Sequence, residues 1–252
     1  MNKNLQKLIL AAILITIGIV LSNILSISYP PGSTIIRIGF GYLPLMIISI
    51  ILGPRIGFVS AIIQDFLGWI FFGYNFGPFF LGFTLNAILY GLVPGLVFRL
   101  RNDWKNVFLY LNIALLTIIL GFGVWGLIEM DYILDMIKTR LGEADFNGIV
   151  IYIILIIGII GALLGYIFLF QKRKGGEMEH RVIFFVIVLQ IVVTLILTPI
   201  WITILYEIPI LPQLPLRIVK TPLEVFVYSI LLIRLLKVFS HYKLLENNSE
   251  NI

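Results

Sequence analysis

Arg217 and Lys220 stand three positions apart near the C-terminal end of the sequence, so on a helix they share one face. Just before them, Pro209, Pro212 and Pro215 are expected to break the chain into a turn. A guanidinium and an ammonium group on one face pair well with carboxylate or phosphate groups. We therefore predict an anion-binding site here. The alternative is that both side chains reach along the helix toward lipid headgroups.

Four other side chains are candidates to recognise a flat, polar ligand. Trp201 and Tyr206 precede the proline-rich turn and offer rings for stacking, while Thr84 and Asn86 offer hydrogen-bonding groups near the start of another helix. The alternatives are an aromatic belt at a membrane interface for the rings and hydrogen bonds between helices for the polar pair. The predicted binding set also includes two residues from other loops, Arg37 and Asn75.

Catalytic and nucleotide-binding chemistry finds little support in the sequence. It contains no phosphate-binding GxxxxGK[ST] loop, no HExxH and no GxSxG, and its cysteine count is zero. Asp65 and Glu224 are ionisable residues inside apolar stretches, and we predict a structural hydrogen bond or ion pair for Asp65. An intramembrane enzyme with one of these two as its acid is the less favoured alternative. We expect no catalytic residues, no metal site and no cofactor.

The elements that must position these residues are apolar. The sequence is 60% hydrophobic and 12% charged, and its mean hydropathy is +1.07. A membrane-spanning helix needs about 20 apolar residues, and unpaired backbone groups are too costly in lipid for other structures. We predict an all-α transmembrane bundle, a single membrane domain over 1–252, with about eight spans: Leu8–Ile27, Ile38–Leu52, Ile56–Phe72, Phe80–Phe98, Val107–Ile128, Ile149–Phe170, Val182–Leu205 and Pro222–Leu236.

The positive charges alternate between the loops. Base-rich loops follow every second span, and the positive-inside rule makes that side cytoplasmic. With eight crossings both termini are then cytoplasmic, in a multi-pass protein of the cell membrane. The net charge of +5 is thus explained by topology and not by nucleic acid. The polar residues 244–252 are expected to form a disordered tail.

Several of these segments, taken together and in order, resemble a known family. The chain is similar to the substrate-binding S component of energy-coupling-factor (ECF) vitamin transporters, and in particular to the folate type. The matching pieces are Arg37–Pro44, Ile51–Pro54, Asp65–Gly68, Gly77–Leu85, Trp201–Tyr206 and Leu214–Ile218.

The resemblance implies a six-helix core, formed here by 1–100 and 182–240. The segment 105–172 is then an inserted helix pair with its outer loop. The resemblance also implies that the chain captures a vitamin at its outer side and docks through its first helix onto a membrane scaffold subunit driven by two ATPase subunits. The small residues of that helix suit such docking: Ala12, Thr16, Gly18 and Ser22.

Folate fits the predicted binding residues. Its flat pterin ring suits Trp201, Tyr206, Thr84 and Asn86, and its anionic glutamate tail suits Arg217 or Lys220. The same family with another cargo, such as pantothenate or a queuosine precursor, is the nearest alternative. A pure scaffold without vitamin affinity is a further one.

Overall fold

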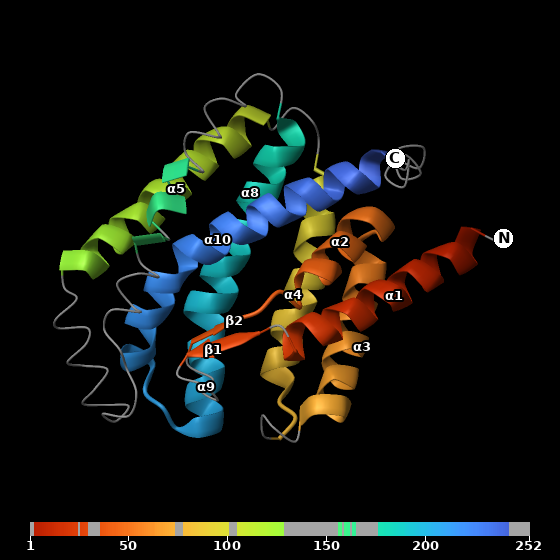
Figure 1. Ribbon diagram of the computed structural model, residues 1–252, viewed down its shortest axis with the longest axis horizontal. Helices are drawn as coiled ribbons and strands as arrows, with labels where there is room; N and C mark the ends of the chain where they lie inside the picture. The colour runs from red at the N-terminus through yellow and green to blue at the C-terminus, as the bar shows by residue number, and fades with distance from the viewer. Residues whose placement is uncertain are drawn as a thin grey trace. The chain divides into compact units, whose positions relative to one another are not determined.

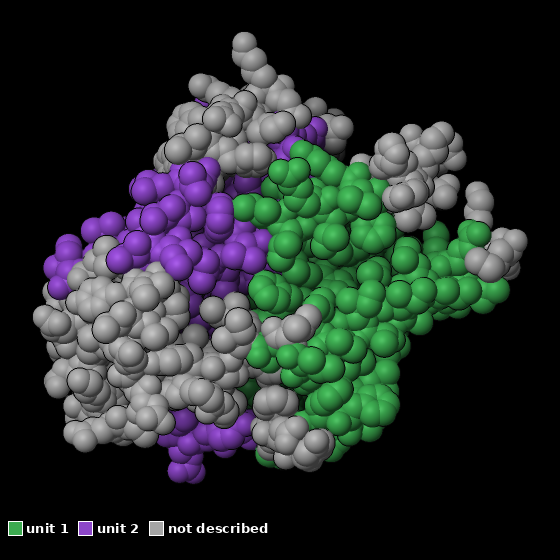
Figure 2. Space-filling view, viewed as in Figure 1, with its two compact units in different colours: residues 1–26, 39–101, 230–252 green, residues 27–38, 102–229 purple. Residues whose placement is uncertain are grey.

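The computed structural model describes residues 3–24, 26–29, 36–73, 78–100, 105–128, 156–157, 159–161, 163–164 and 176–241. Several sequence-based predictions lie outside these residues: Asn75, most of the expected span 149–170 with the loop before it, and the tail 244–252. The chain forms two compact units (Figure 2). Unit 1 comprises residues 1–26, 39–101 and 230–252, and unit 2 comprises residues 27–38 and 102–229.

Unit 1 is a group of packed helices (Figure 1). Its helices are α1 (Lys3–Asn23), α2 (Leu43–Leu52), α3 (Pro54–Phe72) and α4 (Leu81–Phe98), with the last part of α10 (Ile210–His241). The helix α3 packs against α4, α2 and α1, and α2 also packs against α4. Helices α1, α3 and α4 are each long and apolar enough to cross a membrane.

A backbone break separates α2 from α3. Gly53 has a φ of 101°, a conformation that favours glycine, and Pro54 then occupies the first position of α3, where its missing N–H costs nothing. All ten residues of α2 are buried. Ten helical residues rise only about 15 Å, so the predicted span Ile38–Leu52 is wrong as a full crossing. It is a short buried helix, and Ile38 belongs to a strand.

A serine joins α2 to the irregular part of α4. Pro94 lies inside α4 and cannot donate a backbone hydrogen bond. The next residue, Gly95, donates its N–H to Oγ of Ser49 at 2.9 Å. The same Oγ donates to the carbonyl of Leu92 at 3.4 Å. Ser49 thus satisfies backbone groups at the point where the proline disturbs the helix.

Unit 2 contains the remaining elements. These are β1 (Ile27–Tyr29), β2 (Ile36–Ile38), α5 (Lys105–Ile128), α8 (Glu177–Leu189), the π-helix η3 (Gln190–Leu197), α9 (Thr198–Tyr206) and residues 210–229 of α10. The helices α8, η3 and α9 follow one another without a break, and the whole segment is a candidate membrane span. Helix α5 packs against α8, where Nδ2 of Asn112 donates to the carbonyl of His180 at 2.8 Å.

The prediction of a helical membrane protein is confirmed in its main part. Four helices within the described residues are long and apolar enough to span a membrane. The structure also contains one element that the sequence analysis missed, an antiparallel pair of three-residue strands in which Ser28 pairs with Arg37.

The last helix begins earlier than predicted. Pro212 and Pro215 do not break the chain, because α10 already starts at Ile210 and runs to His241. Both prolines lie within its first two turns, and Pro212 stands in the first turn, where the backbone N–H has no helical partner to lose. The predicted span Pro222–Leu236 is therefore the inner part of a longer helix.

Two glycines of unit 1 provide a matched test of the packing between α3 and α4. A Cβ atom at Gly57 would meet the backbone oxygen of Gly91, whereas a Cβ at Gly68 of the same helix would meet nothing within 4 Å. We expect Gly57→Ala to lower the stability by about 1–3 kcal/mol. Gly68→Ala should leave it unchanged or raise it by up to about 1 kcal/mol. Thermal unfolding of the purified variants in detergent is the measurement, and equal melting temperatures would contradict the close packing.

Candidate ligand-binding site

A buried polar stripe runs along one face of α10. Its members recur at helical spacing on one side of the helix, and each residue as a whole is at most 5% exposed. They are Gln213, Arg217, Lys220, Thr221 and Glu224. Charged residues are almost never fully buried unless they are paired. Each charged group of the stripe therefore needs a partner.

Lys220 and Glu224 account for part of the charge. The Nζ atom of Lys220 donates to Oε1 of Glu224 at 3.0 Å, and both side chains are 6% exposed. The second carboxylate oxygen of Glu224, Oε2, is buried and has no hydrogen-bond partner among the described residues. One oxygen of this carboxylate is therefore available to a group outside the described residues.

Arg217 leaves more hydrogen-bonding capacity unused. Its Nε and one terminal nitrogen, Nη2, are buried and have no hydrogen-bond partner in the described part of the chain. Glu224 acts on Arg217 through its charge, but the two side chains form no ion pair. A buried guanidinium without a bonded anion is costly. The Arg217 guanidinium is therefore a strong candidate to bind an anionic group supplied by a ligand.

Backbone contacts hold the stripe in place. The hydroxyl of Thr221 donates to the carbonyl of Arg217 at 2.7 Å. At the start of α10, Nε2 of Gln213 donates to the carbonyls of Ile208 at 3.0 Å and Pro209 at 3.2 Å, which closes the turn after α9. The Oε1 atom of Gln213 is buried with no partner among the described residues.

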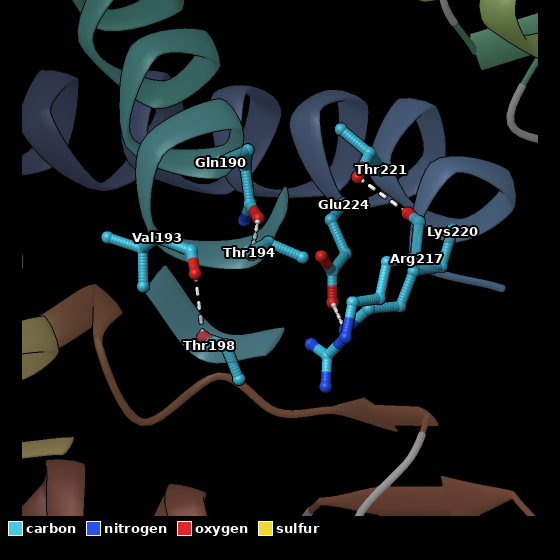
Figure 3. Close-up of polar contacts among 8 residues, drawn as sticks. All are labelled: Gln190, Val193, Thr194, Thr198, Arg217, Lys220, Thr221 and Glu224. Carbon is cyan, nitrogen blue, oxygen red and sulfur yellow. Dashed lines mark hydrogen bonds and ion pairs between the residues drawn. The ribbon is translucent and has the colours of Figure 1, made fainter. Parts of the chain in front are cut away.

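The π-helix η3 contributes polar side chains to the same region of unit 2. Thr194 donates to Oε1 of Gln190 at 2.6 Å, and Thr198 donates to the carbonyl of Val193 at 2.7 Å. Figure 3 shows Gln190 and Thr194 on the side of η3 toward which Glu224 of α10 projects. Short π segments inside helices occur frequently at functional sites, and the buried Gln190 and Thr194 are consistent with one.

The structure separates the predicted binding residues into two groups. Arg217, Lys220, Trp201 and Tyr206 belong to unit 2, on α10 and α9. Trp201 is half-buried, and Tyr206 is exposed at the end of α9. Arg37 also belongs to unit 2, where its backbone pairs with Ser28 in the small sheet, and its side chain lies outside the described part.

Thr84 and Asn86 belong to unit 1, where both are buried in α4. The hydroxyl of Thr84 donates to Oδ2 of Asp65 in α3 at 2.6 Å. Thr84 therefore already has a partner within unit 1, and the bond links the two helices that pack most extensively there.

The predicted docking residues do not form one surface. Ala12 and Thr16 are exposed on α1. Gly18 is buried instead, and a Cβ atom there would meet Oε1 of Gln64. Ser22 packs against Gly41, where a Cβ would meet the Ser22 side chain. The pair Gly18 and Ser22 is therefore used for packing inside unit 1, which differs from its predicted role as an open groove.

Several polar residues of the stripe and of η3 were missed in the sequence. Gln213, Gln190 and Thr194 were not singled out, and Glu224 was considered only as an isolated acid. Its spacing of four residues from Lys220 was the available signal, because such pairs face each other on a helix. For Gln213, Gln190 and Thr194 the available signal was a polar residue at helical spacing within an apolar run.

Comparison with known proteins shows similarity over the first two thirds of the chain. Residues 6–162 match the family described as "ECF transporter, substrate-specific component". The chain is 35% identical over 158 residues to the folate transporter FolT of Clostridium novyi (strain NT), covering 60% of this chain and 88% of that protein. It is 30% identical over 151 residues to an uncharacterised protein of Mycoplasma pneumoniae (strain ATCC 29342 / M129 / Subtype 1), the MG313 homolog, covering 58% of this chain and 50% of that protein.

The family match is continuous through much of the segment 105–172, which the sequence analysis treats as an inserted helix pair. It ends at residue 162, before α8, so the polar stripe of α10 lies outside it.

The buried ion pair allows a test of how the stripe is stabilised. Lys220→Met leaves the Glu224 carboxylate buried without its partner, and we expect a loss of about 3–5 kcal/mol. The double variant Lys220→Met, Glu224→Met replaces the pair with apolar groups and should regain most of that loss. Thermal unfolding in detergent measures both. A double variant as unstable as Lys220→Met would contradict the assignment of the cost to an unpaired charge.

Proposed function

The chain belongs to the family of ECF transporter substrate-specific components, and on that basis we propose that it captures folate at the outer face of the cell membrane for ATP-driven import. The main support is the buried Arg217 guanidinium with two nitrogen atoms that have no partner among the described residues. Folate carries a glutamate tail, and carboxylates are the preferred partners of guanidinium groups. Similarity to a folate transporter favours this cargo over other vitamins.

We assign the anionic tail to Arg217 in preference to Lys220. From the sequence both residues are candidates, but Lys220 already donates to Glu224. Arg217 retains free donors in a planar fork that suits a carboxylate. Lys220 then acts indirectly, by holding Glu224 and adding positive charge beside the anion.

The other predicted contacts to folate remain part of the proposal. Trp201 and Tyr206 on α9 are proposed to stack on the pterin ring, and Thr84 and Asn86 to bind its edge together with Asn75 and Arg37. In this scheme Asp65 is a structural partner of Thr84. Stacking on an aromatic side chain depends little on the substituents of the bound ring. Hydrogen bonds from the polar residues would therefore determine which ring is bound.

We also propose the division of labour with partner subunits. A membrane scaffold subunit and two ATPase subunits would supply the energy, and the chain would contact the scaffold through the exposed face of α1 around Ala12 and Thr16. Small residues on a helix surface allow a second helix to approach closely. We propose further that both termini are cytoplasmic.

The anion contact is tested by substitution of Arg217. We expect Arg217→Ala to weaken folate binding about tenfold or more, because a charged hydrogen bond worth about 1.5–3 kcal/mol is lost. The matched control is Arg234→Ala, which removes an exposed arginine from the same helix and should leave the Kd unchanged. Equilibrium binding to the purified protein is the measurement. A normal Kd for Arg217→Ala would remove this residue from the site.

Docking is tested separately from binding. Ala12→Phe places a bulky side chain on the exposed face of α1, and we expect it to reduce recovery of the scaffold and ATPase subunits in co-purification while leaving the folate Kd unchanged. Ile62→Phe on the exposed face of α3 is the control. Equal recovery of the partner subunits with both variants would exclude this face of α1 from docking.

Pantothenate and a queuosine precursor remain the alternative cargoes. Equilibrium binding with all three compounds separates them. Tighter binding of pantothenate or of the queuosine precursor than of folate would overturn the assignment of cargo while leaving the family assignment intact.

A further inference from the structure

Glu224 has one carboxylate oxygen that the contacts among the described residues do not explain. Its Oε1 atom accepts a hydrogen bond from Lys220 at 3.0 Å, and its Oε2 atom is buried with no partner among the described residues. Glu224 itself is 5% exposed. A carboxylate has lone pairs for about four hydrogen bonds, so the buried oxygen needs a donor. The ion pair with Lys220 uses only one of the two oxygens, so it does not explain why the second oxygen is buried without a donor.

The other charged side chain of the stripe, Arg217, does not supply that donor. Arg217 feels the charge of Glu224, yet its Nε and Nη2 atoms also have no partner among the described residues. An unpaired acceptor, Oε2 of Glu224, and unpaired donors, Nε and Nη2 of Arg217, therefore lie on the same buried face of α10 without bonding to each other. Figure 3 shows both side chains extending from α10 on the side where Thr194 lies. A molecule that offers an acceptor to Arg217 and a donor to Glu224 would satisfy both.

The charges limit what this molecule can be. Arg217 and Lys220 are positive and Glu224 is negative, so the three formal charges leave one net positive charge. One carboxylate neutralises it. The second requirement is an N–H or O–H donor near that carboxylate. An amino acid acylated on its nitrogen carries both, because its amide N–H is one or two carbon atoms away from its carboxylate.

We propose that Glu224 is a specificity-determining residue, which accepts a hydrogen bond from the amide N–H of an N-acylated amino acid whose carboxylate is bound by Arg217. This inference rests on the proposed function and narrows it to one substrate class. The glutamyl amide of folate and the β-alanyl amide of pantothenate belong to the class. The deazaguanine precursors of queuosine have no carboxylate and do not.

The test replaces the donor atom in the ligand. The probes are folic acid and its ester analogue, the pteroyl ester of 2-hydroxyglutarate, in which an oxygen takes the place of the amide N–H and the charge stays the same. We expect the full-length wild-type protein to bind the ester about tenfold or more weakly than folate, since a site built to accept a donor rejects an analogue that lacks it. Equilibrium binding in detergent measures both values.

The variant Glu224→Gln assigns this preference to one residue. Its amide group can donate to the ester oxygen while its carbonyl oxygen still accepts from Lys220. We therefore expect the ratio of the two Kd values to fall toward one. Glu207→Gln is the control, because Glu207 is exposed in the turn between α9 and α10. This variant should keep the wild-type ratio.

The outcomes separate this inference from the proposed function. Equal binding of folate and the ester by the wild-type protein would overturn the role of Glu224, and this result needs no variant to fold. An unchanged ratio in Glu224→Gln would also overturn it. If the wild-type protein binds no folate, the proposed function fails and the inference fails with it.

Discussion

Burial of charge on α10 is the constraint on which the candidate site depends. Arg217, Lys220 and Glu224 lie on one face of the helix, and none is more than 5% exposed. Charges removed from water must be compensated by partners, and removal of one partner strongly destabilises the protein. Lys220 and Glu224 compensate each other in part, through one hydrogen bond. The open donors of Arg217 and the second oxygen of Glu224 then define the chemistry of the missing partner.

Local backbone irregularities position this face and the helices of unit 1. Gln213 bonds to two carbonyls of the turn before α10, so the stripe starts at a defined point. The π-helix η3 brings Gln190 and Thr194 into a bonded pair. In unit 1, the bond from Gly95 to Ser49 satisfies the backbone beside Pro94. Gln213 and Ser49 each use a side chain to satisfy backbone groups at the end or the irregular part of a helix.

The helices were predictable because lipid permits few alternatives. Long apolar stretches indicated α3 and α4 with nearly correct ends, and α1 with ends four or five residues too late. Arg217 was recognised because it shares a helical face with Lys220 after a proline-rich segment. The shortness of α2 was not predictable from hydropathy, because a buried helix and a membrane span share the same composition. The small sheet that pairs Ser28 with Arg37 was missed because its strands have only three residues each, too few to show an alternating pattern.

Other errors have specific physical causes. Proline within the first turn of a helix looks like a break in a sequence, but Pro212 lies where α10 has no hydrogen bond to lose. Gly18 and Ser22 have the spacing of a docking groove, and only the packing of Gln64 and Gly41 shows that the groove is already filled. Glu224 was considered an isolated acid although its spacing from Lys220 indicated a pair, whereas its unpaired oxygen is known only from the contacts of each atom.

The central claim is that the buried face of α10 binds a carboxylate-bearing vitamin through Arg217. It is tested most directly by mass spectrometry of the small molecules released from the full-length protein, after purification in mild detergent from cells supplied with folate. The account predicts folate in nearly equal molar amount to the protein. Release of lipid and detergent alone, with no carboxylate-bearing small molecule, would contradict it.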